Sequence, residues 1–582
     1  MINHKPFEHY WNHKKWILKA IGLNVIVLLA LLFVFEPTPK SDDYDQVMIL
    51  NGGFTGHYSA YLPYCNYLFS KLNQILYSLM PDIAWYYVLQ YVLIFLSFVM
   101  VTIIFERKSD NKKYFEFVIF IVLLFCGYEL YIRFTFTKVA GIAIISGFMA
   151  LLDLILEEQK KIIKYVFSCL LIIAGMTIRV SMYLLIVEVF ASSFFIFLIE
   201  TKKFNIYKLK QTAMFIFFVL LFYMCSIGLS KFHAYMISQD VAWEKWYQVN
   251  SARSRLQDYD MADFETYKEE YSEIGISYND YCTWKKQAIY IDKDYFTQEL
   301  LEDIADIRPV QGEKSIIEIL TDACHSSLSY YLGDTGIYLF FIAAMMIFLL
   351  GGKNSLKYTV IVFLFCFLAY LYMNYRGRLQ HHVDVCPLIA GAFLLLYYSC
   401  RLKEPALQRD MKGNILIFAI VLLFITAFYS EVSSSSYYGS QFGNIASKKE
   451  QQKKNKETLD VLSKDKKHYY LFAAFDTNRI YDDVWGMFQK VELGYYSNLG
   501  ISNRYYFPNI ETTLENYEIS NAIADSVDSD VIRFAATVHN PEYINIVTTY
   551  IREHYNEEAE SILVKQIGEV NVYSIVTDSS SR

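Results

Sequence analysis

The chain has 582 residues, of which 54% are hydrophobic and only 19% are charged. This composition is too apolar for an ordinary soluble protein of this length and is typical of a membrane protein with large polar segments. The net charge of −7 gives no indication of nucleic-acid binding. The nine cysteines show no CxxC or CxxH spacing, so the sequence carries no signature of a cysteine-bound metal.

Apolar runs predict eleven membrane spans. The first run ends at Phe35 and is too long for the core of a signal peptide. Ten further apolar runs are long enough, or nearly so, to cross the hydrocarbon core of a bilayer, which is ~30 Å thick. They lie at 84–105, 114–132, 138–156, 162–178, 180–199, 211–230, 336–351, 357–374, 384–400 and 414–430. Residues 62–80 are amphipathic and predict a helix along the membrane surface.

The loop charges predict the orientation of these spans. With the N-terminus inside, the inner segments together hold 20 Lys and Arg residues, whereas the short outer turns hold five. The positive-inside rule therefore favours a multi-pass protein of the cell membrane with a cytoplasmic N-terminus and an extracytoplasmic C-terminus. Three polar segments then face outward: 36–83, 231–335 and 432–582.

The C-terminal part predicts a separate domain. Residues 1–430 form the transmembrane module, a Ser-rich linker covers 431–454, and 455–582 form a small α/β domain. Strands are expected in YYLFAAFD and VIRFAAT, a helix in PEYINIVTTYIREHY, and a terminal hairpin in SILVKQIGEVNVYSIV. The predicted fold is thus a polytopic α-helical membrane protein with about 11 transmembrane helices and a C-terminal extracytoplasmic α/β domain. Cys282 and Cys324 are candidates for a disulfide if their segment is extracytoplasmic.

A group of acids follows the first predicted span. Asp42, Asp43 and Asp45 lie in SDDYDQVMILNGGFTGHY, and the sequence after them is apolar, aromatic and Gly-rich. This pattern indicates that the acids are held in structure near the membrane surface, although a solvated loop is the simpler alternative. A carboxylate at this depth can act as a general base on a hydroxyl acceptor. The three acids could also hold Mg²⁺ or Mn²⁺, since oxygen ligands suit both ions.

Every short outer turn contains basic residues, although topology alone favours few there. Arginine pairs with phosphate in bidentate geometry, and ionisable groups at membrane depth are usually functional. The alternative is that these side chains reach lipid headgroups, or, for the histidines, that they are ordinary interfacial residues. The basic residues in these turns are Arg133, Lys138, Arg179, Arg376, Arg378, His381 and His382.

At these positions the chain resembles the GT-C class of membrane glycosyltransferases, in particular bacterial cell-envelope members. The resemblance rests on an inner N-terminus, a first outer loop that opens with Asp42 and Asp43, many further spans and an outer C-terminal domain. A second stretch of similarity is ARSRLQDYDMADFETYKEEYSEIGISYND in the large outer segment. The arrangement of spans and loops resembles this class over most of the chain, whereas similar sequence motifs are limited to these two stretches. No WWDYG-type motif is present, which argues against transfer to protein asparagine.

The resemblance implies an inverting glycosyltransferase that transfers a sugar from a polyprenyl-phosphate donor to an envelope glycan or glycolipid. Asp43 or Asp42 would be the general base, and the outer basic residues would bind the donor phosphate. Asp45, His57 and His381 are further candidates for positioning the acceptor. The alternatives are a polymerase of polysaccharide repeat units, a lipid-linked glycan transporter or flippase, and a non-catalytic envelope scaffold.

Overall fold

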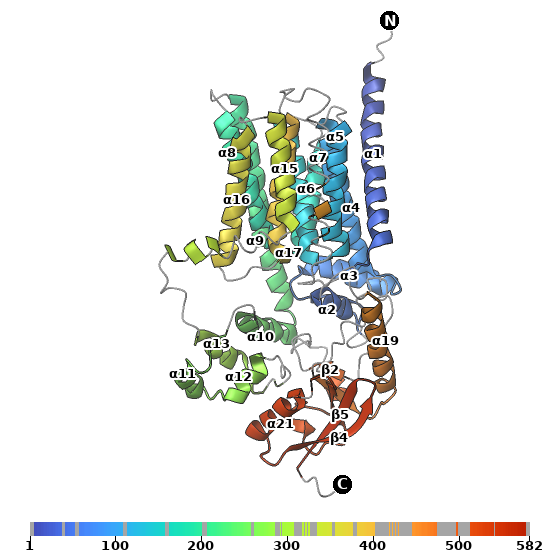
Figure 1. Cartoon of the computed structure of the whole chain (residues 1–582), viewed down its shortest axis with the longest axis vertical. Coiled ribbons are helices and arrows are strands. Elements are labelled where there is room, and N and C mark those ends of the chain that lie inside the picture. Colours follow the sequence, from blue (N-terminus) through green and yellow to red (C-terminus); the bar gives the residue numbers. More distant parts are fainter. Residues whose placement is uncertain are drawn as a thin grey trace.

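The computed structural model is mostly helical, with a small mixed β-sheet at its C-terminal end (Figure 1). It describes 5–37, 41–52, 57–108, 113–157, 162–200, 206–257, 261–285, 294–307, 335–351, 355–375, 381–401, 445–473, 496–498, 513–540 and 542–577, with a few isolated residues between these ranges.

A bundle of long apolar helices forms one end of the molecule. Its helices are α1 (Lys5–Val34), α4 (Trp85–Lys108), α5 (Lys113–Gly127), α6 (Phe136–Leu156), α7 (Ile162–Ile178), α8 (Met182–Glu200), α9 (Ile206–Ile237), α15 (Thr335–Gly351), α16 (Leu356–Tyr375) and α17 (His381–Arg401). A π-helix, η1 (Tyr128–Ile132), continues α5. The start of α1 and the C-terminal sheet lie at opposite ends of the molecule (Figure 1).

Seven helices among the described residues are long and apolar enough to cross a membrane, namely those in α1, α4, α6, α8, α9, α16 and α17. The length and composition of these helices therefore indicate a multi-pass membrane protein. The predicted spans at 162–178 and 336–351 are apolar helices but shorter, and the span predicted at 114–132 is divided between α5 and η1. The span predicted at 414–430 lies largely outside the described residues.

Helices α6 and α17 form the centre of the bundle. Every residue of α6 from Phe136 to Ile155 is buried, and α17 is buried from Asp384 to Ser399. A helix that is apolar on all sides is stable only when other helices or lipid surround it, and here other helices do so. Glycine allows the closest approaches, because a Cβ on Gly147 would lie 2.8 Å from the Ser168 carbonyl oxygen of α7.

Two short helices lie across one end of the bundle. They are α2 (Ser41–Leu50) and α3 (Tyr67–Leu79), and both belong to the segment predicted to face outward first (Figure 1). In α3 the predicted amphipathic pattern is present, since Phe69 and Tyr77 are buried while an apolar stripe is exposed. The exposed stripe consists of Leu68, Leu72, Ile75 and Leu79. This arrangement suits a helix that rests in the surface of a bilayer.

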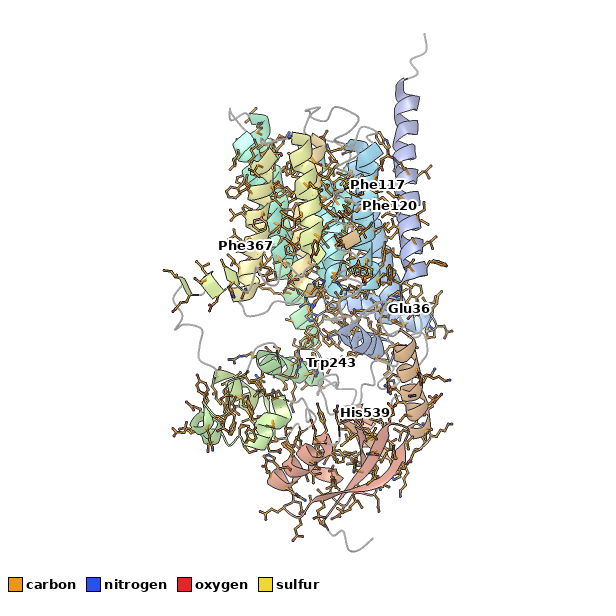
Figure 2. The ribbon with its side chains drawn as sticks, viewed as in Figure 1. Glu36, Phe117, Phe120, Trp243, Phe367 and His539 are labelled. Carbon is orange, nitrogen blue, oxygen red and sulfur yellow. The ribbon has the colours of Figure 1, made fainter. Side chains whose placement is uncertain are left out.

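The second polar segment extends the same end of the molecule. Helix α9 leads into α10 (Val241–Gln257), and α11 (Lys268–Glu273), α12 (Tyr278–Lys285) and α13 (Gln298–Asp306) follow. Trp243 of α10 lies at the junction with the bundle (Figure 2), where its ring is stacked 5.7 Å from the ring of Tyr61. Cys282 and Cys324 are both free, so the disulfide considered for them does not form.

The C-terminal part is built on a five-stranded mixed sheet with the order β2-β1-β3-β5-β4. The strands are β1 (Tyr469–Ala473), β2 (Tyr496–Asn498), β3 (Ile532–Thr537), β4 (Glu560–Ile567) and β5 (Val570–Val576). A short 3-10 helix, η6 (Ala524–Ser526), precedes β3, and α21 (Glu542–His554) follows it. The strands and the helix predicted from VIRFAAT, PEYINIVTTYIREHY and the terminal hairpin are confirmed.

Helix α19 (Ile445–Leu462) begins inside the stretch expected to be a linker and packs on the sheet. Gln451 donates a hydrogen bond to Glu569 at 2.7 Å, and Thr458 lies against Gly568 in the β4–β5 turn. Gly568 has φ +57°, which suits the hairpin turn that requires glycine first. Part of the predicted linker is therefore ordered structure that supports the C-terminal sheet.

Candidate functional site

The acids that follow α1 in the chain lie on a helix and not in a solvated loop. Asp42 and Asp43 occupy the first turn of α2, where the helix dipole stabilises negative charge. Asp43 and Asp45 are buried, whereas Asp42 is half-buried. Asp43 Oδ1 accepts hydrogen bonds from the Tyr86 hydroxyl at 2.8 Å and from the backbone N–H of Phe136 at 3.3 Å.

The first turn of α6 connects these acids to the basic residues. Phe136 donates its N–H to Asp43, and the next residue, Thr137, accepts a hydrogen bond from Arg179 Nη1 at 2.6 Å. The third residue, Lys138, is itself one of the predicted basic residues. Residues 136–138 thus bring Asp43 of α2 together with two cations, Lys138 and Arg179, at the N-terminal end of α6.

Glu129 is the centre of the basic group. It lies on the π-helix η1 and is 1% exposed. Lys138 Nζ lies 2.5 Å from Glu129 Oε2, Arg133 Nη1 lies 2.9 Å from Oε1, and His381 Nε2 lies 3.2 Å from Oε2. The positive charges of Arg133 and Lys138 are therefore balanced by a buried carboxylate, as buried charges generally must be. π-Helical turns occur frequently at functional sites.

Arg179 is the half-buried cation of the site and lies among aromatic rings. Its guanidinium carbon lies 5.3 Å from the centre of the Phe136 ring and 6.0 Å from that of Tyr64. These distances correspond to cation–π contacts. Tyr64 has φ +70°, which is unfavourable for a tyrosine, and its ring stacks on Phe136. Strained backbone of this kind occurs preferentially at functional sites.

Cys65 is a buried cysteine that follows Tyr64 in the chain. Its thiol donates to Gln46 Oε1 at 2.9 Å. Burial, and next the charge of Asp43, raise the pKa of the Cys65 thiol well above its usual value, while the charge of Arg179 lowers that pKa. Both charges are therefore near enough to the Cys65 thiol to affect its pKa.

The acids do not form a metal site by their geometry. Because α2 is a helix, the side chains of Asp43 and Asp45 point to different sides, and Asp43 Oδ1 is occupied by two hydrogen-bond donors. Among the described residues, one group of three metal-ligating side chains lies elsewhere, and its ligand atoms are within 4.8 Å of one another. Asp43 and Asp45 are thus not placed to hold one Mg²⁺ or Mn²⁺ ion together, and the three acids of α2 do not form a group of three converging ligands.

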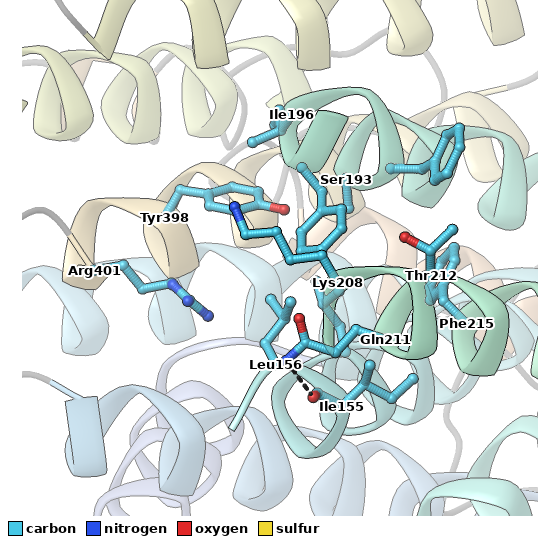
Figure 3. A pocket seen from close by; sticks show the side chains of 13 residues that line it. Ile155, Leu156, Ser193, Ile196, Lys208, Gln211, Thr212, Phe215, Tyr398 and Arg401 are labelled. Carbon is cyan, nitrogen blue, oxygen red and sulfur yellow. Dashed lines mark hydrogen bonds between the residues drawn. The ribbon is translucent and has the colours of Figure 1, made fainter. Parts of the chain in front are cut away.

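A cavity of about 230 Å³ lies between α6, α8, α9 and α17 (Figure 3). It is lined by residues at the end of α6, the end of α17 and the start of α9, so it lies at the opposite end of the bundle from α2. This cavity is separate from the group around Asp43.

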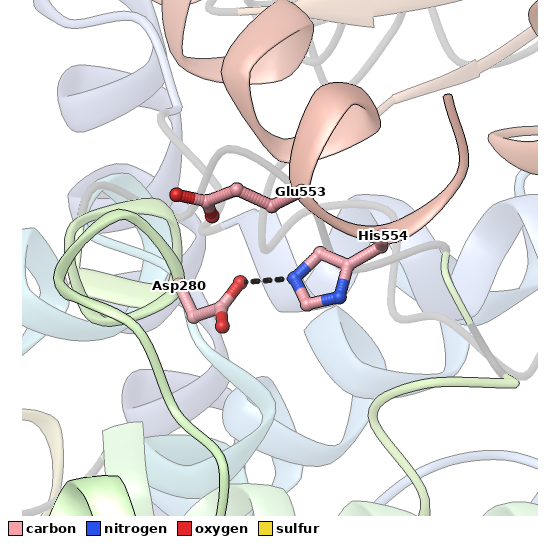
Figure 4. Close-up of side chains that lie close together, drawn as sticks. All are labelled: Asp280, Glu553 and His554. Atoms are coloured by element: carbon pink, nitrogen blue, oxygen red, sulfur yellow. Dashed lines mark hydrogen bonds and ion pairs between the residues drawn. The ribbon is translucent and has the colours of Figure 1, made fainter. Parts of the chain in front are cut away.

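The three-residue group consists of Asp280, Glu553 and His554, and it joins the second polar segment to the C-terminal sheet domain (Figure 4). His554 Nε2 lies 2.7 Å from Asp280 Oδ1, and Oδ2 of Asp280 accepts from the Tyr295 hydroxyl at 3.0 Å. The Tyr550 hydroxyl also donates to Asp292 at 2.7 Å. Because both of its oxygens accept hydrogen bonds, Asp280 helps to hold the second polar segment against α21 of the C-terminal domain.

The structure brings together five of the predicted site residues, namely Asp43, Arg133, Lys138, Arg179 and His381. His57 is exposed, and Arg376 and Arg378 lie outside the described residues.

The sequence pattern did not indicate five further residues of this site: Tyr64, Cys65, Tyr86, Glu129 and Thr137. Glu129 lay within a predicted span, and an acid inside an apolar run is a signal that could have revealed it. No protein-family model, no curated protein and no solved structure matches this chain.

Proposed function

We propose that this chain is a membrane glycosyltransferase of the GT-C type that uses a polyprenyl-phosphate sugar donor. The observation that carries the proposal is the first turn of α6, which contacts Asp43 through Phe136 and Arg179 through Thr137. A carboxylate and a guanidinium are thereby held at one end of the helix bundle, where the spans reach the membrane surface. The acceptor is an envelope glycan or glycolipid on the outer face, with the N-terminus cytoplasmic and the C-terminus extracytoplasmic.

In the proposed reaction Asp43 takes the proton from the acceptor hydroxyl as that oxygen bonds to the anomeric carbon of the sugar. The bond between the anomeric carbon and the phosphate oxygen breaks, and the electron pair leaves with the polyprenyl phosphate. Arg179 stabilises the charge that develops on this leaving group. Attack from the face opposite the phosphate inverts the anomeric configuration.

The ion pairs around Glu129 hold the start of α6 in place. These ion pairs hold Lys138 and Arg133, and Lys138 also donates to the carbonyl oxygen of Arg133 at 3.1 Å. Because these contacts fix the turn between η1 and α6, they keep Phe136 and Thr137 in position. We assign Arg133 and Lys138 to this positioning role and to the positive potential of the donor site.

The test is transfer by the purified full chain in lipid nanodiscs that contain a polyprenyl-phosphate sugar, with release of free polyprenyl phosphate measured by mass spectrometry. Asp43→Asn and Asp42→Asn are compared with Asp82→Asn, an exposed acid in the same segment. Loss of a general base costs on the order of 10²–10⁴ in rate. Full activity of both Asp43→Asn and Asp42→Asn would overturn the proposal. Movement of intact donor across the bilayer would indicate a flippase, and joined repeat units on one lipid a polymerase.

A further inference from the structure

The cavity between α6, α8, α9 and α17 combines apolar walls with two cations (Figure 3). Ile155, Ile196 and Phe215 contribute apolar side chains to its walls. Lys208, at the start of α9, and Arg401, at the end of α17, are the positively charged residues of the lining. A cavity with apolar walls and two cations in its lining can bind a molecule that has a hydrocarbon part and an anionic headgroup.

Arg401 retains capacity for an anionic partner. Its Nη1 lies 3.4 Å from the Tyr397 hydroxyl and 3.9 Å from Glu157, and both contacts are long for a group with five N–H donors. Glu157 has a closer cation, because Lys108 Nζ lies 2.5 Å from it. The other nearby carboxylate, Asp153, is likewise paired with Arg107 and Lys108. The acids next to the cavity are therefore satisfied mainly by cations other than Arg401.

Ser193 gives an independent indication of a ligand. It lines the cavity from α8 and is 4% exposed, and its hydroxyl has no hydrogen-bond partner among the residues that the structure describes. Buried hydroxyls normally have a hydrogen-bond partner, because burying one without a partner is unfavourable. A phosphate oxygen in the cavity would supply one.

We propose that this cavity binds the phosphate headgroup of an anionic membrane lipid, with Lys208 and Arg401 at the phosphate and Ser193 inside the cavity. Its position favours a lipid over a soluble phosphate, because the cavity lies between helices that are long enough to span the bilayer and near their ends. Anionic headgroups are found at this depth. The site is at the opposite end of the bundle from Asp43, so the proposal stands independently of the proposed glycosyltransferase activity.

The experiment titrates the delipidated full chain in neutral detergent with phosphatidylglycerol and, separately, with zwitterionic phosphatidylcholine, and counts bound lipid by native mass spectrometry. We expect retention of phosphatidylglycerol, with about tenfold weaker binding for Lys208→Gln and for Arg401→Gln, because each loses a charge-assisted hydrogen bond. Lys210→Gln is the matched control. Lys210 is an exposed lysine two residues further along α9, on another face of the helix.

A second variant, Ser193→Met, fills the cavity and leaves both cations in place. It should weaken phosphatidylglycerol binding while the thermal stability of the protein is retained. Equal binding of the two lipids, or an equal loss for Lys210→Gln, would overturn the proposal. Displacement of phosphatidylglycerol by inorganic phosphate at similar concentration would identify free phosphate as the ligand and would overturn the lipid assignment.

Discussion

The Tyr86 hydroxyl donates a hydrogen bond to Asp43 Oδ1 at 2.8 Å, although the two residues are 43 positions apart in the chain. Both side chains are fully buried. The same oxygen accepts from the N–H of Phe136, so Asp43 connects α2 to α4 and to α6. A carboxylate held by two donors has a fixed orientation, which suits the general-base role that we propose for Asp43.

Replacement of Tyr86 tests this orientation. For Tyr86→Phe we expect sugar transfer to fall about tenfold to a hundredfold, because a hydrogen bond to a charged group contributes about 1.5–3 kcal/mol. Tyr91→Phe is the matched control on α4, since its hydroxyl donates to the Tyr131 carbonyl oxygen at 2.6 Å. The measurement is the initial rate of transfer in nanodiscs. Equal losses in both variants would show that Tyr86 contributes packing and does not orient Asp43.

Glu129 should be critical for stability. For Glu129→Gln we expect a loss of about 3–5 kcal/mol in the free energy of unfolding, because Lys138 and Arg133 would remain as buried charges without their carboxylate. The side chains of these two cations are 0% and 3% exposed. The free energy can be measured by titrating the purified protein from mild detergent into dodecyl sulfate.

The control for that experiment is Glu157→Gln. The side chain of Glu157 is 40% exposed, although it is also paired with Lys108. An exposed ion pair contributes about 1 kcal/mol or less, so this variant should remain close to the wild-type stability. A small effect for both variants would contradict the view that Glu129 neutralises the cluster.

The sequence was sufficient to locate most helices but not to measure distances between them. Runs of apolar residues predict helices because a segment that crosses a bilayer must be mostly apolar, and ten helices coincide with predicted spans. The π-helix η1 was not predicted, since one extra residue in a helical turn leaves the apolar pattern unchanged. The acids of α2 were expected to be held in structure, but the helix itself was not predicted, because its burial depends on contacts with α3, α4 and α6.

The candidate site shows the same limit. The presence of a basic residue in every short turn predicted to face outward indicated Arg133, Lys138 and Arg179. The role of Glu129 depends on the tertiary contact that brings it to His381, 252 positions away in the chain. From their positions in the sequence these cations were expected to bind a phosphate, whereas two of them contact Glu129. Composition and topology report which charges are present, and only the fold determines which charges meet.

The turn before β1 should respond to acid. Burial alone would raise the pKa of Asp465, but hydrogen bonds from His468 and Tyr470 outweigh it and lower the pKa to about 2, from an ordinary value of 3.8. A folded-state pKa below the unfolded value means that the ionised carboxylate stabilises the fold. This contribution is fully present above about pH 4 and is lost as the pH falls through about 2.

The variant Asp465→Asn removes this contribution at every pH. We expect faster amide hydrogen exchange in Tyr469–Ala473 than in wild type at pH 5, by an amount that corresponds to about 1 kcal/mol or less for a partly exposed pair. The difference between the two proteins should shrink toward pH 2. Comparison at equal pH removes the intrinsic pH dependence of exchange. A constant difference from pH 5 to pH 2 would contradict the assignment.

Gly568 in the β4–β5 turn should tolerate no side chain. Its φ of +57° is unfavourable for other residues, and a Cβ would lie 2.8 Å from Thr458 Oγ1 of α19. That hydroxyl is held by its own hydrogen bond to the Lys454 carbonyl oxygen at 2.9 Å. For Gly568→Ala we expect a loss of about 1–3 kcal/mol in the stability of the C-terminal sheet, measured by hydrogen exchange in β4 and β5.

Two further variants separate backbone strain from the clash with α19. Gly275→Ala carries the backbone strain alone, since φ is +77° and nothing lies within 4 Å of the added Cβ, so its loss should be smaller. Thr458→Ala, combined with Gly568→Ala, removes the atom that the new methyl group would meet. The pair should therefore be less destabilised than the sum of the single variants, because residues in contact are coupled. Strict additivity would show that α19 does not pack on this turn.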